Sequence, residues 1–216
     1  MAGRNQMQSV AWRPALVTRA AVVFGCVLCL LTACAVAPEQ RTAKSVEDFM
    51  GALASLCGQS FAGKITANEP ANPDDAFIGK DLVMHVRDCD SARMAIPFHV
   101  GDDHSRTWLI TRHADRLRLE HDHRHADGSP DSLSFYGGDA ADAGSATRQE
   151  FPINDATRDL FTRLDLMVSM TNVWAMEIIP GARFSYQLTR PGRVFQVDFD
   201  LTRPVATPPA AWGFSK

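Results

Sequence analysis

Three of the chain's seven histidines alternate within one short segment. His121, His123 and His125 are separated by charged residues, one of which is Arg124. In a β-strand, side chains two residues apart point to the same face, about 7 Å from one another. Two of these imidazoles can therefore bind one tetrahedral Zn²⁺ at about 2.0 to 2.1 Å. With Arg124 beside them, an anionic head group is as reasonable a ligand as a metal cation.

The third histidine does not reach the same metal ion unless the strand bends, because residues i and i+4 of a strand lie about 13 Å apart. A metal site then needs ligands from other strands, and the candidates are His85 and His99. The alternating pattern places both on the outward face of neighbouring strands. The segment therefore leaves three interpretations open: a metal site, a ligand-facing cluster, and surface histidines paired with nearby carboxylates.

The segment is also similar to the H-x-H-x-D-H zinc signature of metallo-β-lactamase-like hydrolases, with His121 and His123 at its first two positions. His125 and Ala126 stand where the signature has Asp and His. The βα alternation of that fold is absent from the sequence. A metal-dependent hydrolase, with Asp127 as the base, is kept as one alternative.

The first 33 residues have the layout of an export signal. Three arginines and no acidic residue precede or flank the apolar run Ala20–Leu31, which is too short to span a bilayer. Leu31-Thr32-Ala33-Cys34 resembles the lipobox of bacterial lipoproteins. The resemblance implies cleavage before Cys34, a diacylglycerol on its sulfur and a fatty acyl chain, such as palmitate, on its nitrogen. The alternatives are an uncleaved anchor over residues 20–37 and ordinary cleavage after Ala33 or Ala37.

The same resemblance implies a location. Ala35 follows Cys34, and lipoproteins retained in the inner membrane carry Asp at that position. We therefore expect an exported protein anchored to the outer membrane and facing the periplasm. Loss of the leader changes the formal charge from −3 to −6, which argues against nucleic acid as a partner.

Two cysteines remain in the mature chain after the leader is removed and Cys34 is lipidated, namely Cys57 and Cys89. An isolated pair in an oxidising compartment predicts a disulfide bond. Two unrelated buried thiols are the alternative.

Two helices are expected. Residues 34–44 lack apolar periodicity and are interpreted as a lipidated tether. A helix then begins at Ser45 with an apolar face that repeats at helical spacing and ends at Gly58. Asn154 or Asp155 caps a second helix.

The remainder is predicted to be a meander of antiparallel strands, since apolar residues alternate with polar ones between turns rich in Gly, Pro and Asp. Pro97 places its strand at an edge or a bulge. Gly138–Ser145 is expected to be a long surface loop. The predicted strands lie near residues 60–65, 82–86, 94–100, 106–112, 117–125, 133–137, 168, 174–179, 184–188 and 195–201.

This order indicates a mainly β fold, an antiparallel up-and-down barrel or a strongly curved sheet, with an N-terminal helix and one inserted helix. In outline it resembles the lipocalin and calycin group, whose barrels often hold a small apolar ligand. A single domain is expected over residues 45–205, followed by a C-terminal tail, 206–216. We expect a lipid-anchored binding or accessory protein for a small apolar or metal-containing ligand. If a metal is bound, we expect a zinc ion held by His121 and His123. An envelope scaffold that interacts with protein partners through its loops is the other alternative.

Overall fold

The computed structural model describes residues 38–73, 75–113, 115–142 and 144–214. Eleven strands, two α-helices and one 3₁₀ helix occur in this part of the chain. Their bounds are α1 Pro38–Ala54, β1 Ser60–Glu69, β2 Leu82–His85, β3 Asp88–Cys89, β4 Arg93–Val100, β5 Asp103–His113, β6 Arg116–His123, β7 Tyr136–Asp139, β8 Arg148–Pro152, α2 Asp155–Arg163, η1 Met167–Ser169, β9 Val173–Ile179, β10 Arg183–Arg190 and β11 Arg193–Val205.

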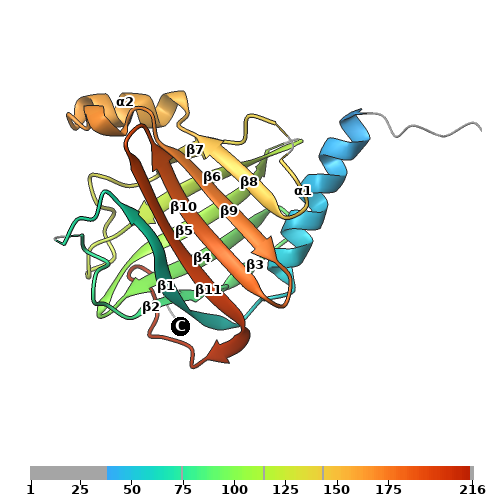
Figure 1. Ribbon diagram of the computed structural model, residues 1–216, viewed down its shortest axis with the longest axis horizontal. Helices are drawn as coiled ribbons and strands as arrows, with labels where there is room; N and C mark the ends of the chain where they lie inside the picture. The colour runs from blue at the N-terminus through green and yellow to red at the C-terminus, as the bar shows by residue number, and fades with distance from the viewer. Residues whose placement is uncertain (1–37, 74, 114, 143, 215–216) are drawn as a thin grey trace, which may run out of the picture. The chain divides into compact units, whose positions relative to one another are not determined.

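The strands form one antiparallel sheet that is nearly closed into a barrel. Its order is β7-β6-β5-β4-β2-β1-β11-β10-β9-β8, with β3 added beside β4. In Figure 1, β9–β11 cross in front of β4–β6 as two walls of the barrel. This confirms the predicted fold class and is consistent with the calycin-like outline.

The barrel is closed at β7 and β8 by a close backbone approach. A single antiparallel bridge joins Gly138 to Ile153. A Cβ on Gly138 would lie 2.2 Å from the carbonyl oxygen of Pro152, and one on Gly137 would lie 1.8 Å from that of Leu119. Only glycine fits at these two positions, so the Gly-Gly pair allows β7 to lie between β6 and β8.

The helix α1 covers one end of the barrel. Its side chains Val46, Phe49 and Leu53 are fully buried in the same core as the inward residues of the strands. The helix contacts β6 and β9. Cys57 and Cys89 form the predicted disulfide, which joins the segment after α1 to β3.

Several local predictions differ from the structure. The predicted loop Gly138–Ser145 is wrong at its start, because Gly138 and Asp139 belong to β7 and Gly138 is buried. The helix α1 begins at Pro38 and so includes most of the predicted tether; proline in the first turn lacks only an N–H that has no partner there. The segment around Val168 is a 3₁₀ turn with exposed side chains, since it has no neighbouring strand. The strand β8 was not predicted, because its five residues have too short a pattern.

Pro97 lies within β4, which is an interior strand rather than an edge. Its neighbours on one side are β2, paired as far as Phe98, and β3, paired from Ala95. Pro97 therefore lies opposite the break between β2 and β3, where its missing N–H disrupts no ladder. Pro97 pairs in regular register with Thr107 on β5, so the predicted edge is wrong, and the register shift of this ladder lies between Phe98 and Val100.

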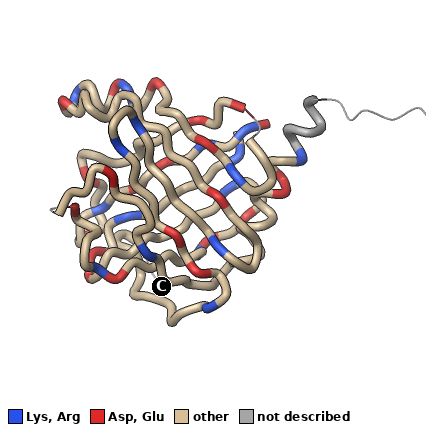
Figure 2. The backbone as a smooth tube through the Cα atoms, viewed as in Figure 1, with Lys and Arg blue, Asp and Glu red and all other residues tan. Residues whose placement is uncertain are grey.

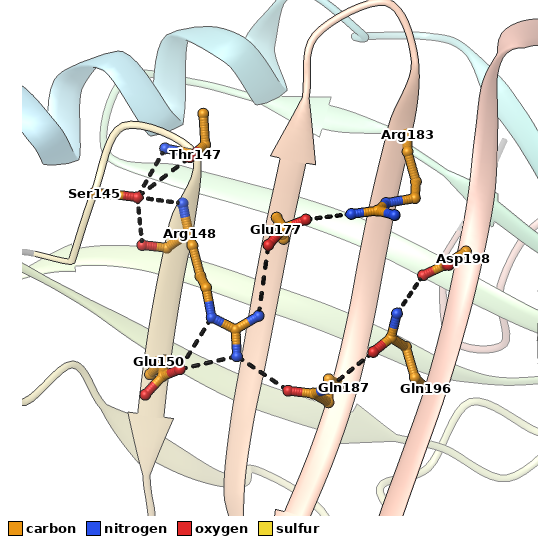
Figure 3. Close-up of polar contacts among 9 residues, drawn as sticks. All are labelled: Ser145, Thr147, Arg148, Glu150, Glu177, Arg183, Gln187, Gln196 and Asp198. Atoms are coloured by element: carbon orange, nitrogen blue, oxygen red, sulfur yellow. Dashed lines mark hydrogen bonds and ion pairs between the residues drawn. The ribbon is translucent and has the colours of Figure 1, made fainter. Parts of the chain in front are cut away.

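The outer face of β8–β11 is polar. Figure 3 shows Arg148 on β8 reaching Glu150, Glu177 on β9 and Gln187 on β10, while Gln187 donates in turn to Gln196 on β11. Basic and acidic residues alternate over the strands in Figure 2, so opposite charges lie near one another.

Part of the outer face of β4–β6, near His104 and Arg124, is instead covered by the C-terminal segment, residues 206–214. Its Trp212 N–H donates to the carbonyl oxygen of His104 at 3.0 Å. Its Phe214 ring lies against the guanidinium groups of Arg87, at 3.9 Å, and Arg124, at 5.1 Å. The predicted tail is therefore packed on the barrel as far as Phe214.

Candidate functional site

A polar cluster lies inside the barrel, at the end opposite α1. It is positioned by the register of β5 and β6, in which Arg106 faces His123 and Trp108 faces His121. Because side chains alternate along a strand, these four residues all point inward, on the face that also carries Leu119. The sequence prediction that His121 and His123 lie on the same face of one strand is confirmed.

His121 is 3 % exposed and hydrogen-bonded at both ring nitrogens. Its Nδ1 lies 3.1 Å from the carbonyl oxygen of Tyr136, and its Nε2 lies 2.8 Å from the hydroxyl oxygen of Tyr186. A carbonyl only accepts, so Nδ1 carries the hydrogen; Nε2 is then an acceptor, and the Tyr186 hydroxyl donates to it. Burial lowers the pKa of His121 to about 3, with a smaller contribution from His123, so the ring is neutral.

His123 is less buried and faces Tyr136. Its Nε2 lies 3.2 Å from the Tyr136 hydroxyl oxygen, and its backbone N–H donates to Ser134 Oγ at 2.9 Å. Burial, followed by the nearby charge of Arg106, lowers the pKa of His123 to about 4. Burial raises the pKa of the Tyr136 and Tyr186 hydroxyls, so both phenols are neutral at pH 7.

Four aromatic rings lie in series beside these groups. Phe77 stacks on Phe98 with centroids 5.7 Å apart, Phe98 on Trp108 at 4.7 Å, and Trp108 on Tyr186 at 4.5 Å. Phe77 belongs to the segment between β1 and β2, which is held to β11 by Arg193: its guanidinium lies 2.9 Å from a carboxylate oxygen of Asp75.

A cavity of about 200 Å³ lies among these side chains. It is lined by Phe77, Phe98, Arg106, Thr107, Trp108, His121, His123, Tyr136 and Tyr186. No acidic residue is among them, and Arg106 carries the one formal charge. Since a water molecule has a share of about 30 Å³ in the liquid, the space corresponds to about seven waters, or to a small organic molecule.

The comparisons with known proteins leave the site without a family context. No protein-family model, no curated protein and no solved structure matches this chain.

Two other predicted ligand residues lie away from the cavity. The strand β6 ends at His123, so His125 is in the following turn, exposed, with Nδ1 4.0 Å from Asp131. Arg124 points to the outer face, where it pairs with Asp122 and contacts Phe214. Asp127, the proposed base of a hydrolase, is exposed in the same turn and accepts from Ser129.

The described residues include no group of three or more His, Cys, Asp or Glu side chains placed to hold a metal ion. The Nε2 lone pair of His121 is already used by Tyr186. His85 and His99 lie on the outer face, as predicted, and His99 pairs with His104 there. The zinc interpretation of His121 and His123 stays a prediction without a further ligand.

The sequence prediction did not include Arg106, Trp108, Tyr136 or Tyr186 among the site residues. One signal was available for Arg106: it alternates with Trp108 and Ile110 and so lies on the apolar face of its strand. Tyr136 and Tyr186 had no such signal, because they are 15 and 65 residues from His121, respectively, and only the register of the barrel brings them together.

Cys34 and the whole predicted leader, residues 1–33, lie outside the described residues. In the part of the chain that is described, no helix is long and apolar enough to cross a membrane.

Proposed function

We propose that this protein is a lipid-anchored binding protein of the bacterial envelope, which holds a small organic ligand in the cavity at the end of its barrel. The observation that carries the proposal is the cavity itself, with two inward histidines and two tyrosines beside a wall of aromatic rings. Sites for small ligands combine such apolar walls with a few placed polar groups. The sequence of the leader supports the anchor and the envelope location.

The polar groups support binding more than catalysis. His121 has both nitrogens in fixed hydrogen bonds within the protein, so it is a rigid part of the wall. The residues that line the described cavity include no serine, cysteine, aspartate or glutamate beside His123. A role as an envelope scaffold stays an alternative, and it would make no use of the cavity.

The experiment is a ligand-observed NMR screen of neutral, cationic and anionic single-ring compounds against the protein and two variants. His123→Trp fills the cavity, whereas His125→Trp makes the same change on an exposed turn two residues away. We expect compounds that bind the unchanged protein to bind His125→Trp and not His123→Trp. Binding that survives in both variants, or no binding by any class, would reject the cavity as the site.

A further inference from the structure

Arg106 brings unused hydrogen-bond donors to the cavity. A guanidinium has five N–H donors. Nη1 of Arg106 donates to a carboxylate oxygen of Asp103 at 2.5 Å, while its Nε and Nη2 have no partner among the described protein groups. The guanidinium lies beside the Phe77 ring, 5.4 Å from its centroid, at the wall of the cavity.

The pair His123 and Tyr136 supplies one more donor. A neutral imidazole carries one N–H and a phenol one O–H, but only one hydrogen lies between Nε2 and the hydroxyl oxygen. If the phenol donates, the hydrogen on Nδ1 of His123 is left over. If the imidazole donates, the phenol hydrogen is left over. Either way, one donor of this pair has no partner.

The remaining wall suits a flat ring. Phe98 and Trp108 stack with an interplanar angle of 17°, and His121 stacks on Tyr136 at 6°. The cavity thus combines aromatic surfaces with donors, one positive charge and no acidic lining residue. A ligand that matches this set has an aromatic ring and a negatively charged acceptor group.

We propose that the ligand is a single-ring aromatic carboxylate, with its ring against the aromatic wall and its carboxylate between Arg106 and the His123–Tyr136 pair. This inference rests on the proposed function of the cavity as a binding site. The volume of about 200 Å³ limits the ligand to about one ring with its substituents.

A second cleft with an arginine makes a weaker anion site. It lies between β2, β3 and the C-terminal segment and is lined by Arg87, Asp88 and Phe214 among others. Arg87 donates there to both carboxylate oxygens of Asp88, so its charge is neutralised by a bidentate pair within the cleft. Arg106 also forms an ion pair, with Asp103, but through Nη1 alone, and Asp103 does not line its cavity.

The test is calorimetric titration of the protein, as isolated from an expressing bacterium, with benzoate, benzamide and benzylamine. We expect benzoate to bind more tightly than its neutral and cationic analogues. Arg106→Gln should weaken benzoate binding by about tenfold to a hundredfold, the range for a lost charge-assisted hydrogen bond. Arg118→Gln is the matched control, since Arg118 pairs with Asp139 on the outer face of the neighbouring strand.

The outcomes separate this inference from the proposed function. If benzamide binds as tightly as benzoate and Arg106→Gln has no effect, the cavity binds ligands but the carboxylate class is wrong. If benzoate binding weakens equally in Arg106→Gln and Arg118→Gln, the anion is bound by general surface charge and the inference fails. If none of the three binds while another compound of the screen binds in the cavity, the ligand class is again wrong and the proposed function stands.

Discussion

The hydroxyl oxygen of Tyr186 lies 2.8 Å from Nε2 of His121, between two strands on opposite walls of the barrel. The two residues are 65 positions apart in the chain. The Tyr136 carbonyl fixes the tautomer of His121, and the Tyr186 hydroxyl holds the ring from its other side. Both side chains line the cavity, so their hydrogen bond holds this part of the cavity wall in place.

Tyr186→Phe removes the only donor to His121 Nε2. We expect this to lower the free energy of unfolding by about 1 to 3 kcal/mol, since a buried acceptor is left without a partner. Tyr136→Phe is the control, because His123 is less buried and can bind water instead; its effect should be smaller. Urea denaturation of the two variants measures the difference. Equal losses in the free energy of unfolding would show that the Tyr186 hydrogen bond stabilises the fold no more than the Tyr136 hydrogen bond does.

Stability should fall with acid between pH 6.5 and about 4. Burial lowers the pKa of His121 to about 3 and of His99 to about 4 in the folded chain, against an ordinary value of 6.5. The unfolded chain therefore binds more protons in this window, so the stabilising contribution is complete above pH 6.5 and is lost as the pH falls. The slope is about 1.36 kcal/mol per pH unit for each such histidine.

The pH range from 6.5 to about 4 also distinguishes the contribution of the histidines to stability from that of the carboxylates. The pKa values of Asp103 and Asp139 are lowered from 3.8, so their contribution is lost only at lower pH. Urea denaturation at pH 7, 6 and 5 measures the slope. A free energy of unfolding that is constant over this range would mean that His121 and His99 take up protons in the folded state without cost.

The disulfide Cys57–Cys89 closes a loop of 32 residues. By the chain-entropy relation, a loop of this length stabilises the folded state by about 3.7 kcal/mol at 25 °C. We expect Cys57→Ser/Cys89→Ser to lose about 2 to 4 kcal/mol in chemical denaturation, and reduction of the unchanged protein to give a similar loss. A loss well under 1 kcal/mol would show that the helix α1 is held by packing alone.

Cys34 is expected to carry the lipid. Metabolic labelling with an alkyne-bearing palmitate should mark the protein, and Cys34→Ser should abolish the label and release the protein from the membrane fraction. Cys29→Ser, in the predicted leader, is the matched control and should leave both unchanged. Label retained in Cys34→Ser would overturn the lipoprotein assignment.

The barrel was predictable because its strands carry a local signal. Phe195, Val197, Phe199 and Leu201 alternate with polar residues, and all four are buried in the observed β11. The capping residue Asn154 likewise has a local signal, and its side chain accepts from the Thr157 N–H as expected. Such patterns depend only on neighbours in the chain, so they can be read without knowing the tertiary structure.

The candidate site was only half predictable. His121 and His123 were found because they are two residues apart on one strand. Their partners Tyr136 and Tyr186 come from β7 and β10, and no local pattern says which strands face one another across a barrel. His125 was placed with them because nothing in the pattern marks the end of β6 at His123.

Selective ¹³C labelling of the histidine rings tests the central claim most directly, because the seven rings report on both faces of the barrel. The spectrum is recorded as the tightest-binding compound of the single-ring screen is added. We predict that the His121 and His123 signals shift and saturate together, while those of the exposed His113 and His125 stay fixed. Shifts confined to His113, His125 or the outer pair His99 and His104 would contradict a binding site inside the barrel.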